Sequence, residues 1–514
     1  MRKLLLTVLL ITLLLCGCGK KVDPIDDNYR VFYEIFVGSF SDSNNDGIGD
    51  LRGIINRLDY LNDGDIDSDD SLHIQGIWLT PIFESPSYHK YDVIDYYNVD
   101  PVFGTNDDLK ELIDECHKRN VKVILDMVIN HTSTKNEWFK EFKKAHVNND
   151  ITNKYYNYYA FASSDNRKPG HTWYKINGCN DYYEGNFSSD MPELNFNSDD
   201  VKREVLDIAK HYLDMGVDGF RFDAAKYIYL GDNENTVSFW NWYTDELKSI
   251  KDDVYLVGEV WSSDNETKQY IKEMNCFNFQ MANGEGMIAK TAKSGDVNQF
   301  ASYITSYVSA IKEGNEDAML IPFISNHDMD RSAGYLMMAN RFPYIAANLY
   351  ILCPGSPFIY YGEEIGLKGS RGGANTDANR RLKMLWGDGD TVENPEGTTF
   401  DEGKQTNGTV KDHLENKDSL LNYYIRLIKI RNKYPEIARG EYQAIKNTNK
   451  MSGFIITYNN EITGLIHNTS ANDELTIDLS DYSFKEIKDY IGMNDASFKD
   501  NTLTVGPQTS VIIK

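Results

Sequence analysis

The sequence predicts an α/β protein, a (β/α)₈ TIM barrel with an inserted domain after the third strand and a C-terminal antiparallel β-sandwich domain. Three observations predict this fold: short apolar runs, helix-like segments between several of them, and a change to alternating polarity near the C-terminus. The eight candidate strands are Val31–Val37, Ile74–Leu79, Val121–Ile129, Val217–Phe222, Val254–Val257, Cys276–Gln280, Met319–Ile324 and Pro357–Tyr361.

Helix-like segments separate several of these runs, which is typical of parallel strands joined by crossover helices. Apolar residues fall three and four apart in Asp107–Arg119 and Val201–Met215. Strands that are apolar on both faces favour a sheet covered by helices, and eight repeats favour closure into a barrel. An open, doubly wound sheet is the alternative, but no Gly-x-Gly-x-x-Gly motif follows a candidate strand.

A long connection and a C-terminal change of pattern divide the chain. Residues 132–195 are rich in Tyr, Asn, Ser and Gly, and a connection of this length is usually a functional insertion. We therefore assign the barrel to residues 30–131 and 196–434. Residues 435–514 contain alternating apolar and polar runs, which indicates a small antiparallel β domain.

The first residues have the composition of a secretory signal. Arg2 and Lys3 precede the apolar stretch Leu4–Leu15. This stretch is shorter than the roughly 20 residues that a membrane-spanning helix needs. We therefore expect residues 1–17 to be a signal peptide that is removed from the mature protein.

The end of this stretch indicates a lipid anchor. Leu15-Cys16-Gly17-Cys18 resembles a bacterial lipobox, so we expect Cys18 to carry a lipid and residues 18–29 to form a short tether. The protein would then be an extracytoplasmic lipoprotein that faces the cell surface or the periplasm and contacts the membrane only through its anchor. An ordinary secretory signal is the alternative.

The net negative charge of the chain argues against anionic binding partners. The 53 Lys and Arg residues against 78 Asp and Glu residues leave a net charge of -25, which repels nucleic-acid phosphates and anionic lipids but not a neutral polymer. We therefore expect no nucleic-acid partner, and we favour a monomer. The four cysteines after Cys18 lack a Cys-x-x-Cys pair, so we expect isolated buried thiols at Cys116, Cys179, Cys276 and Cys353.

Titratable side chains follow four of the candidate strands. They end the third, fourth, fifth and seventh strands in Asp126-Met127-Val128-Ile129-Asn130-His131, Gly219-Phe220-Arg221-Phe222-Asp223, Gly258-Glu259-Val260-Trp261 and Ser325-Asn326-His327-Asp328. The carboxyl ends of barrel strands meet at one mouth, where the active sites of this fold lie. Each motif alone could be a turn or a helix cap, but their order on successive strands favours one catalytic site.

The three carboxylates suggest different roles. Arg221 and Asp223 point to the same side of a strand, and a guanidinium lowers the pKa of a neighbouring carboxyl, so Asp223 is predicted to be an ionised nucleophile. Glu259 has no adjacent cation in the sequence, so a water-poor pocket would raise its pKa and suit it to acid/base work. Retaining glycosidases hold two such groups about 5 to 5.5 Å apart. Asp328 would grip sugar hydroxyls and stabilise an oxocarbenium-like transition state.

Taken in order, these motifs resemble those of the α-amylase family, glycoside hydrolase family 13, over residues 30–514. The resemblance implies that Asp223 is the nucleophile, Glu259 the acid/base and Asp328 the transition-state stabiliser. It also implies that four residues surround the sugar on the non-reducing side of the cleaved bond: Arg221, His131, His327 and the stacking Tyr91. Lys90 stands where the family usually has Gly, so the backbone next to Tyr91 departs from the family pattern.

Two further motifs bear on the substrate. Met191-Pro192-Glu193-Leu194-Asn195 is similar to the motif that closes the family's domain B, in the group between α-amylases and oligo-1,6-glucosidases. Ala224-Ala225-Lys226-Tyr227 is similar to the amylase form, in which the Lys binds glucose units past the cleavage point, although Tyr227 replaces a frequent His. The resemblance implies endo-hydrolysis of α-1,4 bonds in starch, glycogen or maltooligosaccharides.

One loop has the composition of a Ca²⁺ site. Oxygen donors fall at alternate positions around Gly47, at Asp42, Asn44, Asp46, Ile48 and Asp50. Gly53 stands where an EF-hand has its distal Glu, but the loop is similar to the calcium loop after the first strand in this part of the family. A plain Asx-rich turn is the alternative. No organic cofactor is implied.

Three rival functions stay open. A 4-α-glucanotransferase, an α-glucosidase or oligo-1,6-glucosidase, or a neopullulanase-like hydrolase would use the same catalytic residues with a different acceptor or pocket. A non-catalytic glycan-binding protein would not need Asp223, Glu259 and Asp328 intact. A barrel enzyme acting on phosphorylated metabolites would need an anion-binding loop near the eighth strand, where Gly362-Glu363-Glu364 is acidic.

Overall fold

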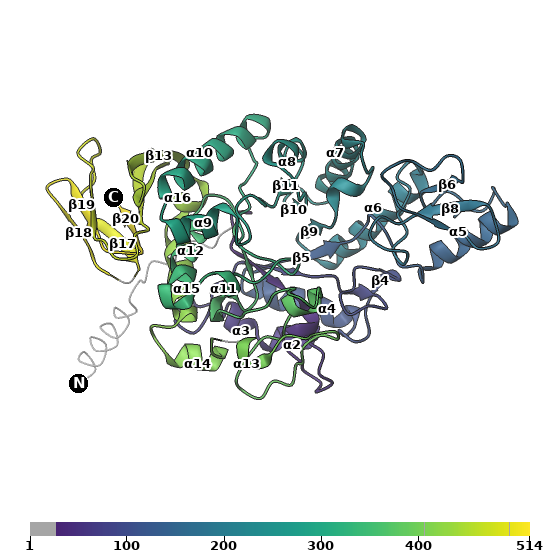
Figure 1. Ribbon diagram of the computed structural model, residues 1–514, viewed down its shortest axis with the longest axis horizontal. Helices are drawn as coiled ribbons and strands as arrows, with labels where there is room; N and C mark the ends of the chain where they lie inside the picture. The colour runs from purple at the N-terminus through teal and green to yellow at the C-terminus, as the bar shows by residue number, and fades with distance from the viewer. Residues whose placement is uncertain (1–26, 406, 493) are drawn as a thin grey trace, which may run out of the picture.

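The computed structural model describes residues 27–405, 407–492 and 494–514 (Figure 1). The predicted signal peptide 1–17 and Cys18 lie outside these described residues. Asp27, within the predicted tether 18–29, has its Oδ2 2.7 Å from Arg439 Nε. Within the described ranges, no helix combines the length and the apolar character needed to cross a membrane.

Seven parallel strands form most of the barrel, in the order β11-β10-β9-β5-β2-β1-β12. Each overlaps a run predicted from the sequence, although β11 is short because the chain turns from Phe279 onward. The strands are β1 (Phe32–Ile35), β2 (Gly76–Leu79), β5 (Lys122–Met127), β9 (Gly219–Phe222), β10 (Tyr255–Gly258), β11 (Asn275–Cys276) and β12 (Phe358–Tyr360).

The predicted strand Met319–Ile324 is not a regular strand, yet it closes the barrel between β11 and β12. On one side Asn278 N donates to Ile321 O at 3.0 Å, and on the other Phe358 N donates to Pro322 O at 3.0 Å. Pro322 has no N–H and cannot complete a hydrogen-bond ladder, which explains the irregularity. The predicted barrel is therefore confirmed, with an irregular segment in place of one strand.

Aromatic side chains fill the inside of the barrel. Phe32 stacks on Phe358 with ring centroids 4.7 Å apart, in a cluster that also contains Trp78. Gly76 makes room for this packing, because a Cβ there would lie 2.4 Å from the Phe32 ring. The rings of Trp78 and His327 pack edge to face with centroids 5.7 Å apart, so the packed interior directly contacts a residue of the site above it.

Helices cover the outside of the barrel. The α-helices outside the insertion are α2 (Leu51–Asn56), α3 (Leu58–Leu61), α4 (Asn106–Lys118), α6 (Asp199–Met215), α7 (Asn233–Ile250), α8 (Asp264–Tyr270), α9 (Met287–Ser294), α10 (Val297–Gly314), α11 (Ser332–Tyr335), α12 (Phe342–Ile351), α13 (Glu402–Gln405), α14 (Val410–Glu415), α15 (Leu420–Lys433) and α16 (Pro435–Arg439). Short 3₁₀ turns are η1 (Val37–Ser39), η2 (Ala225–Tyr227), η3 (Met338–Asn340), η4 (Glu363–Ile365) and η5 (Asp377–Arg380). Cys116, Cys276 and Cys353 are buried free thiols as predicted, whereas Cys179 is half-buried.

The insertion, domain B, lies at one end of the long axis of the molecule (Figure 1). It contains α5 (Glu137–Asn148) and an antiparallel sheet of β6 (Phe161–Ser163), β8 (Asp181–Glu184) and β7 (Trp173–Lys175). A ribbon of β3 (Phe83–Glu84) and β4 (Asp95–Val99) precedes it in the chain. An antiparallel bridge between His131 and Glu193 joins the two ends of the insertion beside the barrel mouth.

The C-terminal domain lies at the opposite end (Figure 1). Two antiparallel sheets pack around Ile466, Leu503 and Val511, which confirms the predicted β-sandwich. Their orders are β13-β14-β15-β20-β17 and β16-β19-β18. The strands are β13 (Glu441–Thr448), β14 (Met451–Tyr458), β15 (Glu461–Asn468), β16 (Leu475–Asp478), β17 (Ile487–Ile491), β18 (Ala496–Lys499), β19 (Thr502–Val505) and β20 (Thr509–Ile513).

Candidate active site

The residues predicted from the strand ends share one open cavity of about 640 Å³. Arg221 and His327 are fully buried at its base, where they bond to residues of the cavity wall. The predicted residues that line the cavity are Tyr91, His131, Asp223, Lys226, Tyr227, Glu259 and Asp328. The fold therefore brings together every residue predicted for catalysis or substrate contact.

Arg221 holds three carboxylates at once. Its Nη1 lies 2.7 Å from Asp126 Oδ1 and 2.8 Å from Asp223 Oδ1, and its Nη2 lies 2.7 Å from Glu259 Oε2. Glu259 has no cation beside it in the sequence, but the fold brings Arg221 to it. The register of β9 and β10 places Arg221 opposite Val257, two residues before Glu259 and therefore on the same side of the sheet.

The pKa of Asp223 is raised, whereas the sequence analysis predicts that Arg221 lowers it. Burial raises the pKa of Asp223 to about 6, because Arg221 offsets only part of the desolvation and Asp126 and Asp328 add negative charge. Burial likewise raises the pKa of Glu259 against the opposing effect of Arg221. Arg221 therefore holds two buried carboxyl groups, both with raised pKa values, close enough together for one to act as nucleophile and the other as acid.

Asp328 faces this pair from the other side of the cavity. Its Oδ2 lies 2.9 Å from His327 Nε2, and its Oδ1 lies 2.8 Å from Arg381 Nη2. Burial alone would raise the pKa of Asp328, but His327 and Arg381 hold it well below its usual range. Asp328 is thus a permanent negative charge, which suits a group that stabilises a developing positive charge.

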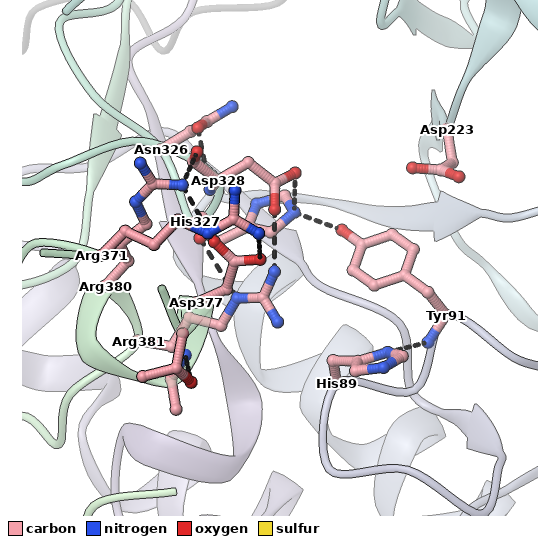
Figure 2. Close-up of polar contacts among 12 residues, drawn as sticks. His89, Tyr91, Asp223, Asn326, His327, Asp328, Arg371, Asp377, Arg380 and Arg381 are labelled. Atoms are coloured by element: carbon pink, nitrogen blue, oxygen red, sulfur yellow. Dashed lines mark hydrogen bonds and ion pairs between the residues drawn. The ribbon is translucent and has the colours of Figure 1, made fainter. Parts of the chain in front are cut away.

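A group of arginines braces Asp328 (Figure 2). Arg381 Nε donates to His327 O at 3.1 Å, and Arg380 Nη1 donates to Asp328 O at 2.8 Å and to Asp377 Oδ1 at 2.9 Å. Figure 2 shows Asp223 apart from this group, beyond Tyr91. Sequence reasoning missed Arg381 because it follows no strand and gives no local signal.

Tyr91 lies between the carboxylates around Arg221 and the charged residues around Asp328. Its hydroxyl donates to Asp126 Oδ2 at 2.9 Å, lies 2.6 Å from His327 Nε2, and its ring stacks on His327 at 5.4 Å. Lys90 has a left-handed φ of 64°, the conformation that favours Gly at this position. Its Nζ is buried 2.7 Å from Asp100 Oδ2, so the ion pair holds this backbone in place.

The remaining predicted residues line the walls of the cavity. Burial lowers the pKa of His131 to about 4, so this side chain is neutral. Lys226 Nζ donates to Trp261 O at 2.9 Å, and Tyr227 contacts Phe187 with centroids 4.9 Å apart. Trp261 is 45% exposed and stacks on Phe279, and Phe187 is 46% exposed. The sequence analysis did not single out either ring as a contact residue, although Trp261 directly follows the strand that carries Glu259.

The predicted calcium loop is compact and joined to a second loop. Asp42 Oδ2 accepts from Gly47 N at 2.8 Å and from Thr391 Oγ1 at 2.6 Å, and Asp50 Oδ1 accepts from Gly53 N at the start of α2. Gly47 has the predicted turn conformation, with φ 87°. In the described part of the chain, no three His, Cys, Asp or Glu side chains are gathered closely enough to hold a metal ion. The loop conformation fits the prediction, but its carboxylates accept backbone hydrogen bonds.

Comparison with known proteins agrees with the geometry. Residues 34–440 match the family described as Alpha amylase, catalytic domain. The protein named Alpha-amylase 3 of Dictyoglomus thermophilum is 35% identical over 491 residues, which cover 94% of this chain and 93% of the relative. The 4-alpha-glucanotransferase of Thermotoga maritima is 29% identical over 454 residues, 86% of this chain and 96% of the relative. The structure of Eubacterium rectale Amy13B has a TM-score of 0.89 and 36% identity, and covers 96% of this chain and 97% of that chain. The chain belongs to the α-amylase family, glycoside hydrolase family 13.

Proposed function

We propose that this protein hydrolyses internal α-1,4-glucosidic bonds of starch-like glucans and maltooligosaccharides with retention of configuration. The observation that carries the proposal is that Asp223 and Glu259 are bonded to the same buried guanidinium at an open cavity, with Asp328 on the opposite wall. Retaining hydrolysis needs two carboxyl groups close enough to act on one sugar ring.

In the first step, the Asp223 carboxylate forms a bond to the anomeric carbon while the bond to the leaving oxygen breaks. Glu259 gives its proton to that oxygen, so the leaving chain departs as an alcohol. In the second step, Glu259 takes a proton from water, whose oxygen displaces Asp223 from the sugar. Asp328 stabilises the positive charge that develops on the ring in both steps, and Arg221 keeps the two reacting groups in place.

The open cavity favours attack within a chain over removal of single end units. Exposed Trp261 and Phe187 offer flat apolar faces on which further glucose units can stack. A 4-α-glucanotransferase is the second candidate, because a relative with that name covers most of this chain. It would form the same covalent intermediate and pass it to a sugar hydroxyl in place of water.

Products released from maltoheptaose over time test the activity. We expect mixed short maltooligosaccharides early, in the α-anomeric form, measured by chromatography and by ¹H NMR of the first products. Products longer than the substrate would indicate glucanotransfer, and glucose alone would indicate an exo-acting pocket. Asp223→Asn should lower kcat by several powers of ten with unchanged folding, because the covalent step needs the carboxylate. The control Asp59→Asn, at a residue whose side chain is 77% exposed, should keep full activity.

The raised pKa of Asp223 predicts the acidic limb of the pH profile. A nucleophile must be ionised, so kcat/KM should fall about tenfold per pH unit below the pKa of about 6. An Asp with its ordinary pKa would keep the enzyme active about two units lower. Initial rates with a chromogenic maltoside, in samples that regain full activity when returned to pH 7, give the limb. A limb near pH 4 would contradict this assignment.

We also propose that the loop of residues 42–50 binds Ca²⁺ through Asp42, Asn44, Asp46, the main-chain oxygen of Ile48 and Asp50. The loop supplies the oxygen donors that Ca²⁺ prefers, and Asn44 and Asp46 are exposed, so their side chains can turn toward an ion. Bound Ca²⁺ would neutralise three carboxylates in a short segment. It would also hold the contacts of this loop with Thr391 and with Glu393, whose N donates to Gly47 O at 2.8 Å.

Removal of the metal should lower the melting temperature. We expect Ca²⁺ to raise the melting midpoint of chelator-treated protein by several degrees, because a ligand at one hundred times its Kd stabilises the folded state by about 2.7 kcal/mol. Scanning calorimetry measures this shift. Asp46→Ala should abolish it, whereas Asp65→Ala should keep it, because Asp65 accepts a similar turn hydrogen bond in a different loop. An equal shift in both variants would exclude this loop.

We propose further that residues 1–17 are a lipoprotein signal and that Cys18 carries the lipid of an extracytoplasmic enzyme. The support is the lipobox-like Leu15-Cys16-Gly17-Cys18 at the end of the apolar stretch Leu4–Leu15. In a bacterial host fed radiolabelled palmitate, the protein should be labelled and sediment with membranes. Cys18→Ser should lose the label, whereas the neighbouring Cys16→Ser should keep it; label retained in Cys18→Ser would contradict the assignment.

A further inference from the structure

A buried carboxylate beneath the active site has no part in the two reaction steps. Glu34 lies on β1 and is 1% exposed. Its Oε1 lies 2.6 Å from His327 Nδ1 and accepts from the backbone N of His327 at 3.2 Å. It therefore holds both the ring and the main chain of His327, the residue that precedes Asp328.

The partners of the two ring nitrogens of His327 indicate that each nitrogen carries a proton. Nδ1 faces Glu34 Oε1 at 2.6 Å, and Nε2 faces Asp328 Oδ2 at 2.9 Å. Burial raises the pKa of Glu34, and His327 and Arg221 oppose that shift. Where both carboxylates are ionised their oxygens can only accept, so each nitrogen donates. Tyr91 agrees with this arrangement: its one hydroxyl proton goes to Asp126 Oδ2, which leaves its oxygen to accept from Nε2. His327 is thus an imidazolium between two carboxylates.

The groups around His327 support this charge state. Burial would lower the pKa of His327, but Asp328 and Glu34 raise it to about 10. Two cations stand nearby: Arg381 donates to the His327 carbonyl, and Arg221 lies beyond Tyr91 and is paired with Asp126. Trp78 covers the ring from the barrel interior, and burial and Arg381 lower the pKa of the neighbouring His89 to about 4, so His89 is neutral.

We propose that Glu34 is a positioning residue that keeps His327 doubly protonated, so that Nε2–H stays a donor toward the Tyr91 hydroxyl oxygen and Asp328 Oδ2 and holds both groups at the cavity. Without Glu34, a neutral His327 would keep its single proton on one nitrogen only. The proposal rests on the proposed glycosidase activity for its role and on the hydrogen-bond geometry for the charge state.

The variant Glu34→Gln keeps the shape of the side chain but removes its negative charge, so it tests the effect of the charge alone. Gln can still accept from Nδ1–H, but it carries no negative charge to hold the second proton. We expect the pKa of His327 to fall by about 1 to 3 units, the effect of removing an opposite charge at this distance. NMR of ¹⁵N-histidine-labelled full-length protein measures this pKa, with His327→Asn to identify the resonance. Tyr33→Phe is the matched control, because Tyr33 precedes Glu34 on β1 and bonds Glu364 instead.

Activity gives a second readout. The ratio of kcat/KM for Glu34→Gln to that of wild type should fall between pH 6.5 and pH 8.5, about fourfold if the pKa of His327 drops by two units from about 10 and about 25-fold if it drops by three, whereas the ratio for Tyr33→Phe should be constant. A Glu34→Gln ratio that is low but equal at both pH values would indicate a purely structural role and overturn the proposal. A neutral His327 in the wild-type spectrum at pH 8 would overturn it even if the variant fails to fold. The spectrum does not depend on turnover, so absence of glucan hydrolysis would count against the proposed function alone.

Discussion

The buried guanidinium of Arg221 is the interaction on which the rest of the site depends. Three carboxylates could not share one desolvated pocket without a cation among them, and leaving a buried charge unpaired costs roughly 3 to 5 kcal/mol. Arg221 meets this need because β9 lies between β5 and β10, so its side chain reaches Asp126 on one neighbour and Glu259 on the other. The geometry of the reacting pair follows from the order of strands in the sheet.

The opposite wall of the cavity solves a different electrostatic problem. Asp328 keeps its charge because His327 and Arg381 both bond to it, whereas Asp223 and Glu259 share a single cation. The surroundings therefore shift the same functional group in different directions: His327 and Arg381 hold the pKa of Asp328 well below its usual range, whereas burial raises the pKa of Asp223 and of Glu259. A sugar placed between the walls would meet negative charge on both faces of its ring.

The floor and the walls of the cavity have different structural origins. The floor rests on the tightly packed aromatic interior of the barrel, through the contact of Trp78 with His327, and this support limits movement of the catalytic groups. The walls come from connections such as domain B, which contributes Phe187, and the segment that carries Arg381. Loops on a rigid scaffold can vary without disturbing the floor, so substrate preference lies mainly in the walls.

The sequence by itself determined the barrel strands, the C-terminal sandwich and the candidate catalytic residues, because local periodicity reports strands and each of these residues ends one. Tertiary structure decided what the sequence could not contain: the second carboxylate on Arg221, the arginines around Asp328, and Glu34 beneath His327. These contacts join segments far apart in the chain. The raised pKa of Glu259 was predicted from the sequence, but the direction of the shift of Asp223 came only from the folded chain, because burial, which dominates it, is a property of the whole packed molecule.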